Sequence, residues 1–171
     1  AKSKWRFQLL DESNQVVREF PEKANPTRAV AQLALSPSGD RVLELQERSR
    51  PAQIYSVSDG TLIDTFHLAP GTSVAEVHWS PNGKWLLVRT VVGDVRIINS
   101  RGGSLLSAHT GKPRVMAVAW EPKSQRVAAL DFEGTVQIYS IENLEEGETL
   151  SANKMFPFPE RSIEWSPDGT W

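Results

Sequence analysis

The sequence predicts an all-β fold in which repeated sheets of four short antiparallel strands form a radial array. Three observations support this prediction: a turn tetrapeptide recurs along the chain, an alternating apolar run flanks each copy, and no segment has a convincing helical period. Spacings of 40 to 45 residues are typical of one such sheet per repeat. The four tetrapeptides begin 44, 41 and 45 residues apart, at Ser36-Pro37-Ser38-Gly39, Ser80-Pro81-Asn82-Gly83, Glu121-Pro122-Lys123-Ser124 and Ser166-Pro167-Asp168-Gly169.

Each tetrapeptide is a reverse-turn signal, because proline fixes φ at the second position and the last residues accept the unusual dihedral angles of a turn. Apolar alternation therefore predicts a strand on each side of the turn, joined as a hairpin. First strands are predicted at 30–35, 74–79, 115–120 and 163–165, and second strands at 41–46, 85–91 and 126–130. Third strands follow at 53–55, 95–98 and 136–139, and fourth strands at 62–66 and 105–107.

Two stretches resemble the WD-repeat β-propellers, in particular their divergent bacterial members. Ala108-His109-Thr110-Gly111 before strand 115–120 is similar to the Gly-His dipeptide of that family, and Glu133 to Ser140 is similar to the stretch that ends in its Trp-Asp signature. Tyr-Ser or Ile-Asn replaces Trp-Asp throughout, so the buried His, Ser/Thr, Asp and Trp network of the family is incomplete in every blade. For His109 the resemblance implies a structural hydrogen bond to a turn carboxylate, Asp131 or Glu133.

The repeats predict about four blades in a single domain, or in a segment of a longer propeller. Three blades are expected at 25–68, 69–110 and 111–159, and a composite blade is expected from 1–24 and 160–171. Three kinds of closure stay open: a four-bladed ring, an eight-bladed ring made by two chains that exchange their terminal halves, or a larger parent propeller. The absence of an initiator Met and an end directly after a turn suggest a processed chain or an excised segment.

The composition excludes several classes of partner and of chemistry. Nineteen basic and 21 acidic side chains give a net charge of −2, so no excess positive field attracts nucleic acid or an anionic membrane surface. The lack of cysteine excludes disulfides, thiolate zinc sites and cysteine nucleophiles. No apolar run approaches the length that spans a bilayer, so we expect a soluble chain without a membrane partner. The compartment stays open, with the cytoplasm slightly favoured.

No catalytic residue, metal site or cofactor is expected. His67 and His109 fall in predicted blade-end loops and His78 in a first strand, without the spacing of metal ligands. The acidic stretch 145–148 is interpreted as a solvated loop between blades. Serine occurs in turns and never in Gly-x-Ser-x-Gly, and the glycines at 102–103 form a turn, not a phosphate cradle.

Three tryptophans, Trp79, Trp120 and Trp165, end the predicted first strands, just before the turns. The family carries a large apolar residue at this place, wedged between neighbouring blades. The resemblance therefore implies a structural, core-packing role for these three side chains.

Arginines occupy three of the four loops that enter first strands: Arg28, Arg114 and Arg161, with Thr72 and Ser73 in the remaining loop. One hypothesis is that they form a basic rim for an acidic peptide or another anion, because guanidinium groups present fixed donor forks. The alternative is that they are ordinary solvated arginines that pair with neighbours such as Glu160. Phe156 and Phe158, held between prolines, are either an exposed hot spot or packing over the adjacent blade.

The leading functional prediction is a non-catalytic protein- or peptide-binding scaffold. An alternative is an isolated or engineered propeller segment whose activity is self-assembly into a closed ring, that is, a homo-oligomer formed by strand exchange. An enzymatic propeller would need histidines and carboxylates that converge on the channel, which the sequence does not favour.

Overall fold

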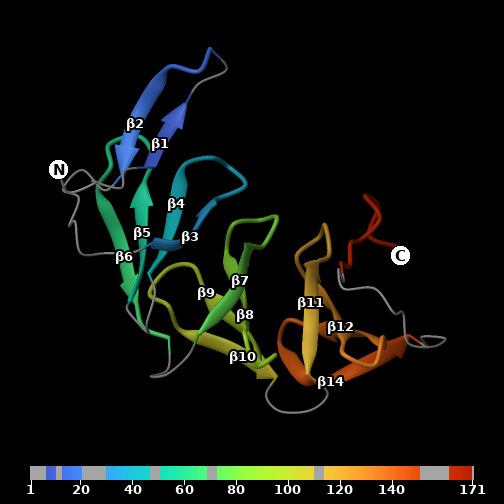
Figure 1. Cartoon of the computed structure of the whole chain (residues 1–171). Helices are drawn as coiled ribbons and strands as arrows, with labels where there is room; N and C mark the ends of the chain where they lie inside the picture. The colour runs from blue at the N-terminus through green and yellow to red at the C-terminus, as the bar shows by residue number, and fades with distance from the viewer. Residues whose placement is uncertain are drawn as a thin grey trace. The chain divides into compact units, whose positions relative to one another are not determined.

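The structure is a computed structural model that describes residues 7–10, 13–20, 30–46, 51–68, 73–109, 114–150 and 162–170. These residues form β-strands joined by turns, in two compact units, Ala1–Gly71 and Thr72–Trp171 (Figure 1). Across the described ranges there is no helix that is long and apolar enough to cross a membrane. The predicted all-β class is therefore confirmed.

The first unit contains a hairpin and one four-stranded sheet. The hairpin pairs β1 (Phe7–Leu10) with β2 (Val16–Phe20), within the residues 1–24 that the sequence assigned to a composite blade. The sheet is an antiparallel meander whose buried face includes Leu43 and Ile54. Its strands are β3 (Val30–Leu35), β4 (Arg41–Gln46), β5 (Ala52–Ser56) and β6 (Leu62–Phe66).

The second unit contains two further antiparallel meanders, in which each strand pairs with the next strand along the chain. Both confirm the predicted repeat of four antiparallel strands. One sheet comprises β7 (Val74–Trp79), β8 (Trp85–Thr90), β9 (Val95–Asn99) and β10 (Leu105–His109). The other comprises β11 (Val115–Trp120), β12 (Arg126–Asp131), β13 (Val136–Ser140) and β14 (Asn143–Leu150).

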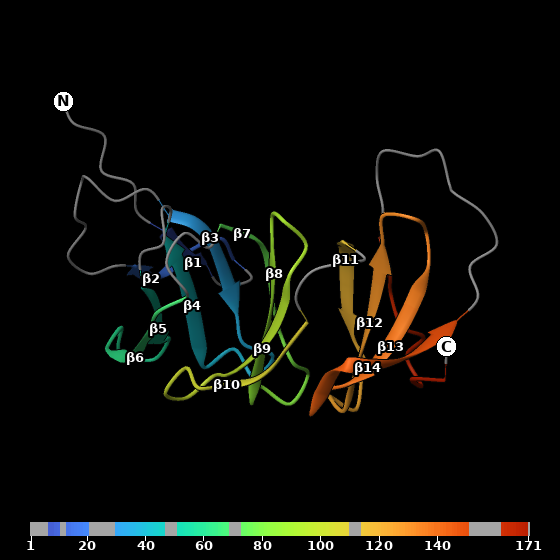
Figure 2. The same ribbon diagram turned by 90° about the horizontal axis from the view of Figure 1, so that it is seen from below.

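The core of the second unit lies between its two sheets, which stand beside each other in Figure 2. Alternation along each strand directs every second side chain to one face, so that one face of each sheet contributes to this core. Leu87 and Ile97 come from one sheet, and Val127 and Tyr139 from the other, all with 3 % or less of their surface exposed. Packing of sheet against sheet thus fixes the loops at their ends.

The serines of the first two Ser-Pro turns close their hairpins. Ser36 Oγ accepts the Arg41 peptide N–H at 3.0 Å, and Ser80 Oγ accepts the Trp85 peptide N–H at 2.9 Å. Both hydroxyls also donate to a turn side chain, Asp40 or Asn82, at 2.8 Å. The side chain thereby satisfies backbone groups that the tight turn leaves without a ladder partner.

One interpretation of the sequence is wrong: residues 145–148 are part of strand β14 and not of a loop. The strand pairs antiparallel with β13, from Val136 opposite Leu150 to Ser140 opposite Asn143. Leu144 is its anchor, because this side chain is 1 % exposed in the core between the sheets. The glutamates stand on the exposed outer strand, where water solvates them while the backbone still pairs.

The first strand expected at 163–165 is also wrong, although the turn after it is present. Gly169 N donates to Ser166 O at 2.9 Å, as in the other turns, but the residues before it form no strand. A strand needs a ladder partner, and none of the residues that the structure describes pairs with this segment. The composite blade from 1–24 and 160–171 stays a prediction.

Candidate functional site

Four exposed side chains lie at one end of the two sheets of the second unit, and we call them the loop-end surface: Val91, Val92, Arg114 and Phe132. Val91 and Val92 begin the turn between β8 and β9, and Phe132 begins the turn between β12 and β13. Arg114 directly precedes β11. The three apolar side chains are 46 %, 63 % and 57 % exposed, in chain order, although large apolar side chains are otherwise favoured inside.

Backbone hydrogen bonds fix the loop-end surface. Val91 N donates to Ser73 O at 2.9 Å, and Phe132 N donates to Arg114 O at 3.0 Å. The two bonds are equivalent, because each ties the first turn residue after a second strand to the residue that precedes the first strand of the same sheet. Both turns therefore hold their exposed side chains on a rigid frame.

A glycine lets the two sheets approach at this end. Gly93 O accepts the Val115 N–H at 3.4 Å, and Arg114 Nη2 donates to Val91 O at 2.6 Å. Gly93 has a φ of +94°, and a Cβ there would lie 2.8 Å from Val115 N and would overlap the Arg114 side chain. Only glycine fits this position without displacing these atoms. The turn between β8 and β9 can therefore lie against Arg114 and Val115 of the other sheet.

Arg114 is the one predicted partner-binding residue that the structure describes. Its side chain is exposed, and across the described ranges no carboxylate pairs with it. Arg28, Arg161, Phe156 and Phe158 lie outside the described residues, so the three-arginine rim and the aromatic loop stay predictions.

Sequence reasoning missed the apolar part of the loop-end surface. The strands predicted at 85–91 and 95–98, and at 126–130 and 136–139, imply turns between them, and Val92 and Phe132 fall in these turns. A bulky apolar residue inside a predicted exposed turn was the available signal, since turns favour glycine, proline and small polar residues.

Trp120 at the end of β11 and Trp165 in the segment 162–170 make the same contact, each with the segment before it. Trp120 Nε1 donates to His78 O, and Trp165 Nε1 donates to Ala119 O, both at 3.2 Å. In each case the acceptor stands just before a first-strand tryptophan: His78 precedes Trp79, and Ala119 precedes Trp120. The segment 162–170 thus contacts the sheet of β11 to β14 as that sheet contacts the one before it.

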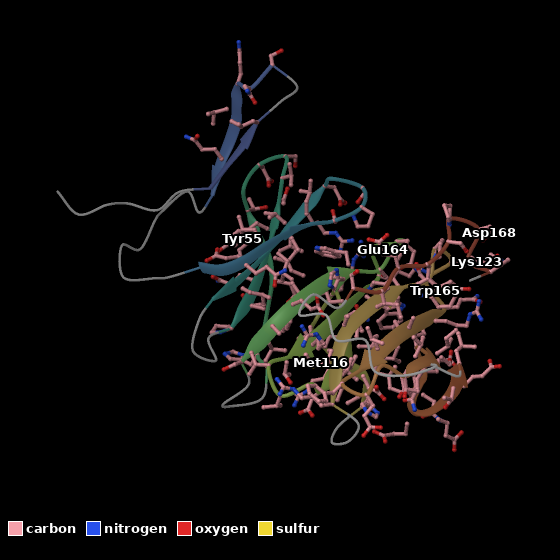
Figure 3. All side chains as sticks on the ribbon, turned by 45° about the vertical axis from the view of Figure 1, so that its right-hand side comes forward. Tyr55, Met116, Lys123, Glu164, Trp165 and Asp168 are labelled. Carbon is pink, nitrogen blue, oxygen red and sulfur yellow. The ribbon has the colours of Figure 1, made fainter. Side chains whose placement is uncertain are left out.

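The turn between β11 and β12 bonds to segments on both sides of it. Glu121 Oε1 accepts from Arg126 Nη2 at 2.7 Å, and Arg126 Nη2 also donates to Gly169 O at 3.1 Å. The guanidinium carbon lies 5.0 Å from the ring centre of Trp165, a cation–π contact, and Figure 3 places Trp165 at this end of the sheet. In the other direction, Ser124 Oγ accepts the Asn82 N–H at 3.1 Å.

His109 ends strand β10 and is buried, whereas the sequence placed it in a loop. Its ring lies 5.6 Å from that of Tyr139, centre to centre. Neither ring nitrogen has a hydrogen-bond partner among the described residues, so the implied bond to Asp131 or Glu133 is not formed. Asp131 instead accepts the Thr135 N–H at 2.8 Å and closes its own turn.

A charged cluster on β7 and β8 is satisfied internally. The Glu76 carboxylate accepts from Arg89 Nε and lies 3.2 Å from His78 Nε2. Burial opposes ionisation, but the hydrogen bonds from His78 and Arg89 outweigh it and hold the pKa of the Glu76 carboxyl below its usual 4.5. Within the part of the chain that the structure describes, no three His, Asp or Glu side chains gather where they could hold a metal ion.

Comparison with known proteins identifies the fold. The sequence model of the anaphase-promoting complex subunit 4 WD40 domain matches residues 66–121, and a search of curated proteins found no match. The β-propeller domain of Cps50 (Swd1) from Myceliophteria thermophila superposes with a TM-score of 0.64 at 16 % identity, over 83 % of this chain and 49 % of that one.

Hydrazine synthase from Kuenenia stuttgartiensis superposes with a TM-score of 0.67, also at 16 % identity, over 97 % of this chain and 60 % of that one. The chain therefore spans about half of the first structure and three fifths of the second. Four-stranded antiparallel sheets, the WD40 match and these propeller structures agree with one another. The chain has a β-propeller fold, and its residues 66–121 match a WD40 domain model.

Proposed function

We propose that the chain is a non-catalytic binding module whose loop-end surface contacts a protein or peptide partner. The observation that carries this proposal is the exposure of three large apolar side chains, Val91, Val92 and Phe132, on turns that backbone hydrogen bonds hold in place. Exposed apolar groups on a rigid frame are typical of interaction sites, because a partner gains from covering them without ordering the loops first.

The comparisons support a binding role more than a catalytic one. WD40 propellers generally serve as protein-interaction modules. Hydrazine synthase is an enzyme, but a likeness at 16 % identity concerns the fold and carries no chemistry to this chain. The charged clusters around Glu76 and Glu121 pair internally.

Panning of a displayed random-peptide library on the full chain tests the proposal. We expect enriched peptides that bind the parent and lose binding to a variant with Val92→Ser and Phe132→Ser. Both side chains are exposed, so circular dichroism should report an unchanged fold. Equal binding of the enriched peptides to parent and variant would contradict a role of the loop-end surface, and no enrichment would contradict the binding module.

A second candidate is self-assembly into a closed ring. The favouring observation is the segment 162–170, whose Trp165 repeats the contact of Trp120 although no described strand pairs with the segment. Strands from another copy of the chain would give this segment the ladder partner that the described residues do not supply.

Light scattering on a sizing column at several concentrations tests self-assembly. A uniform mass of two chains that persists on dilution is the expected result. A uniform mass of one chain at every concentration would rule strand exchange out.

A further inference from the structure

We propose that the segment recognised by the loop-end surface is an extended peptide with one acidic residue next to large apolar residues. Arg114 would bind the carboxylate, while Val92 and Phe132 would cover the apolar side chains. The inference rests on the proposed function and names the chemistry of its partner.

The exposure and the hydrogen bonding of Arg114 favour a ligand that carries an anionic group. The side chain is exposed, and no described carboxylate neutralises it. Its Nη2 donates to Val91 O at 2.6 Å, which orients the guanidinium group before any ligand arrives. The remaining N–H groups can donate to a carboxylate, and a charge-assisted bond to a pre-oriented fork loses little side-chain entropy.

The neighbours of Arg114 support apolar residues beside that acid. The Arg114 peptide oxygen accepts the Phe132 N–H, and the Arg114 guanidinium group bonds to Val91, so the cation lies between the two exposed turns. Phe132 and Val92 are two of the most exposed large apolar side chains in the described residues, at 57 % and 63 %. A ligand with an acid alone would leave this apolar area in water.

Glu133 limits the number of acidic residues that the ligand can carry near this surface. It is exposed, follows Phe132 directly, and occupies the turn position that Val92 occupies in the preceding sheet. A second acidic residue on this side of the ligand would face a like charge, so we infer a single carboxylate and not an acidic run.

Fluorescence anisotropy with three labelled Ser/Gly peptides tests the inference on the full chain. Their centres are Asp-Phe-Leu, Asn-Phe-Leu and Asp-Ser-Ser. We expect Asp-Phe-Leu to bind most tightly and each of the others to lose about tenfold, as for one charge-assisted bond or one covered aromatic group. Arg114→Gln should remove the preference for Asp over Asn, and Glu133→Gln should strengthen binding of both acidic peptides.

Arg101→Gln is the matched control, because Arg101 is an exposed arginine at the opposite end of the β9 strand. It should leave all three affinities unchanged. Equal affinity for Asp-Phe-Leu and Asn-Phe-Leu, or a parent-like Arg114→Gln variant, would overturn the inference. If Phe132→Ser still abolished binding in that case, the binding surface would stand and only the acidic ligand would fail; if no peptide responded to any loop-end variant, the proposed function would fail as well.

Discussion

The two sheets of the second unit have the same arrangement of strands, and equivalent residues lie 41 positions apart in the sequence. Buried positions keep their character: Val77 corresponds to Val118, and Leu86 to Val127, each at most 6 % exposed. The inner strands differ, because Glu76 and Arg89 form an ion pair where the second sheet has Ala117 and Leu130.

The outer strands and first turns differ as well. β10 exposes Leu105 and Leu106, whereas β14 exposes a row of glutamates, and Ser80 at the first turn is replaced by Glu121. Core positions are constrained by the strand period and by the facing sheet, while edges and turns face water or a neighbour. The repeat therefore keeps its core packing and varies at its edge strands and turns.

Removal of a core side chain should have the largest effect. Leu87 is fully buried between the two sheets, so Leu87→Ala should lower the free energy of unfolding by about 2 to 5 kcal/mol through lost packing and a cavity. Urea denaturation measures the change. Leu105→Ala, at a 58 % exposed position of the same sheet, is the control and should change it by less than about 0.5 kcal/mol. Equal losses would mean that the core does not lie between these sheets.

The equivalent glycines Gly93 and Gly134 give the next largest contrast. Both have positive φ, +94° and +89°, so alanine strains either turn by about 1 to 2 kcal/mol. At Gly93 the new Cβ would also meet the Val115 backbone at 2.8 Å, whereas around Gly134 it meets nothing within 4 Å. Gly93→Ala should therefore destabilise the chain more than Gly134→Ala in thermal unfolding. The reverse order would contradict the close approach of the two sheets.

The turn residue Ser124 should show a smaller effect. It has a φ of +62°, where the first sheet of this unit has Gly83, and its hydroxyl accepts the Asn82 N–H. Ser124→Ala should lose about 1 kcal/mol with that bond. Ser124→Gly loses the same bond but relieves backbone strain, so its melting temperature should stay near that of the parent. If alanine proved as stable as glycine, the hydroxyl bond between the turns would contribute nothing.

The smallest effect concerns pH. The pKa of Glu76 is lower in the folded chain than its usual 4.5, so ionised Glu76 stabilises the fold above that pH. This contribution is lost as the pH falls through the lowered pKa. Glu76→Gln should flatten the acid limb of the stability curve, measured by urea denaturation from pH 6 to about pH 3. Glu146→Gln, on the exposed outer strand, should leave that limb unchanged.

The strands next to the first three turn tetrapeptides were predictable almost to the residue. First strands 30–35, 74–79 and 115–120 match the structure, because proline and glycine fix the turn and alternation fixes the strand. β14 was not predictable in this way. Its glutamates disfavour a strand in isolation, and only pairing with β13 and burial of Leu144 make it one.

The candidate site was predictable only in part. Arg114 follows from its place before a first strand, and the turns of Val92 and Phe132 follow from their glycines. The pairing of Glu76 with Arg89 and the bonds of Ser124 and Arg126 depend on strand register and on a neighbouring segment, which local patterns do not encode.

The bonds from Trp120 and Trp165 have a consequence for how such chains lengthen. Each indole donates to a peptide carbonyl, and every residue supplies that acceptor whatever its side chain is. A duplicated repeat that keeps its tryptophan therefore meets a ready acceptor on the repeat before it, with no matching substitution required there. The acceptor residue can therefore change freely, and it is histidine in one copy and alanine in the next. The same indole-to-carbonyl bond can join each added repeat to the one before it.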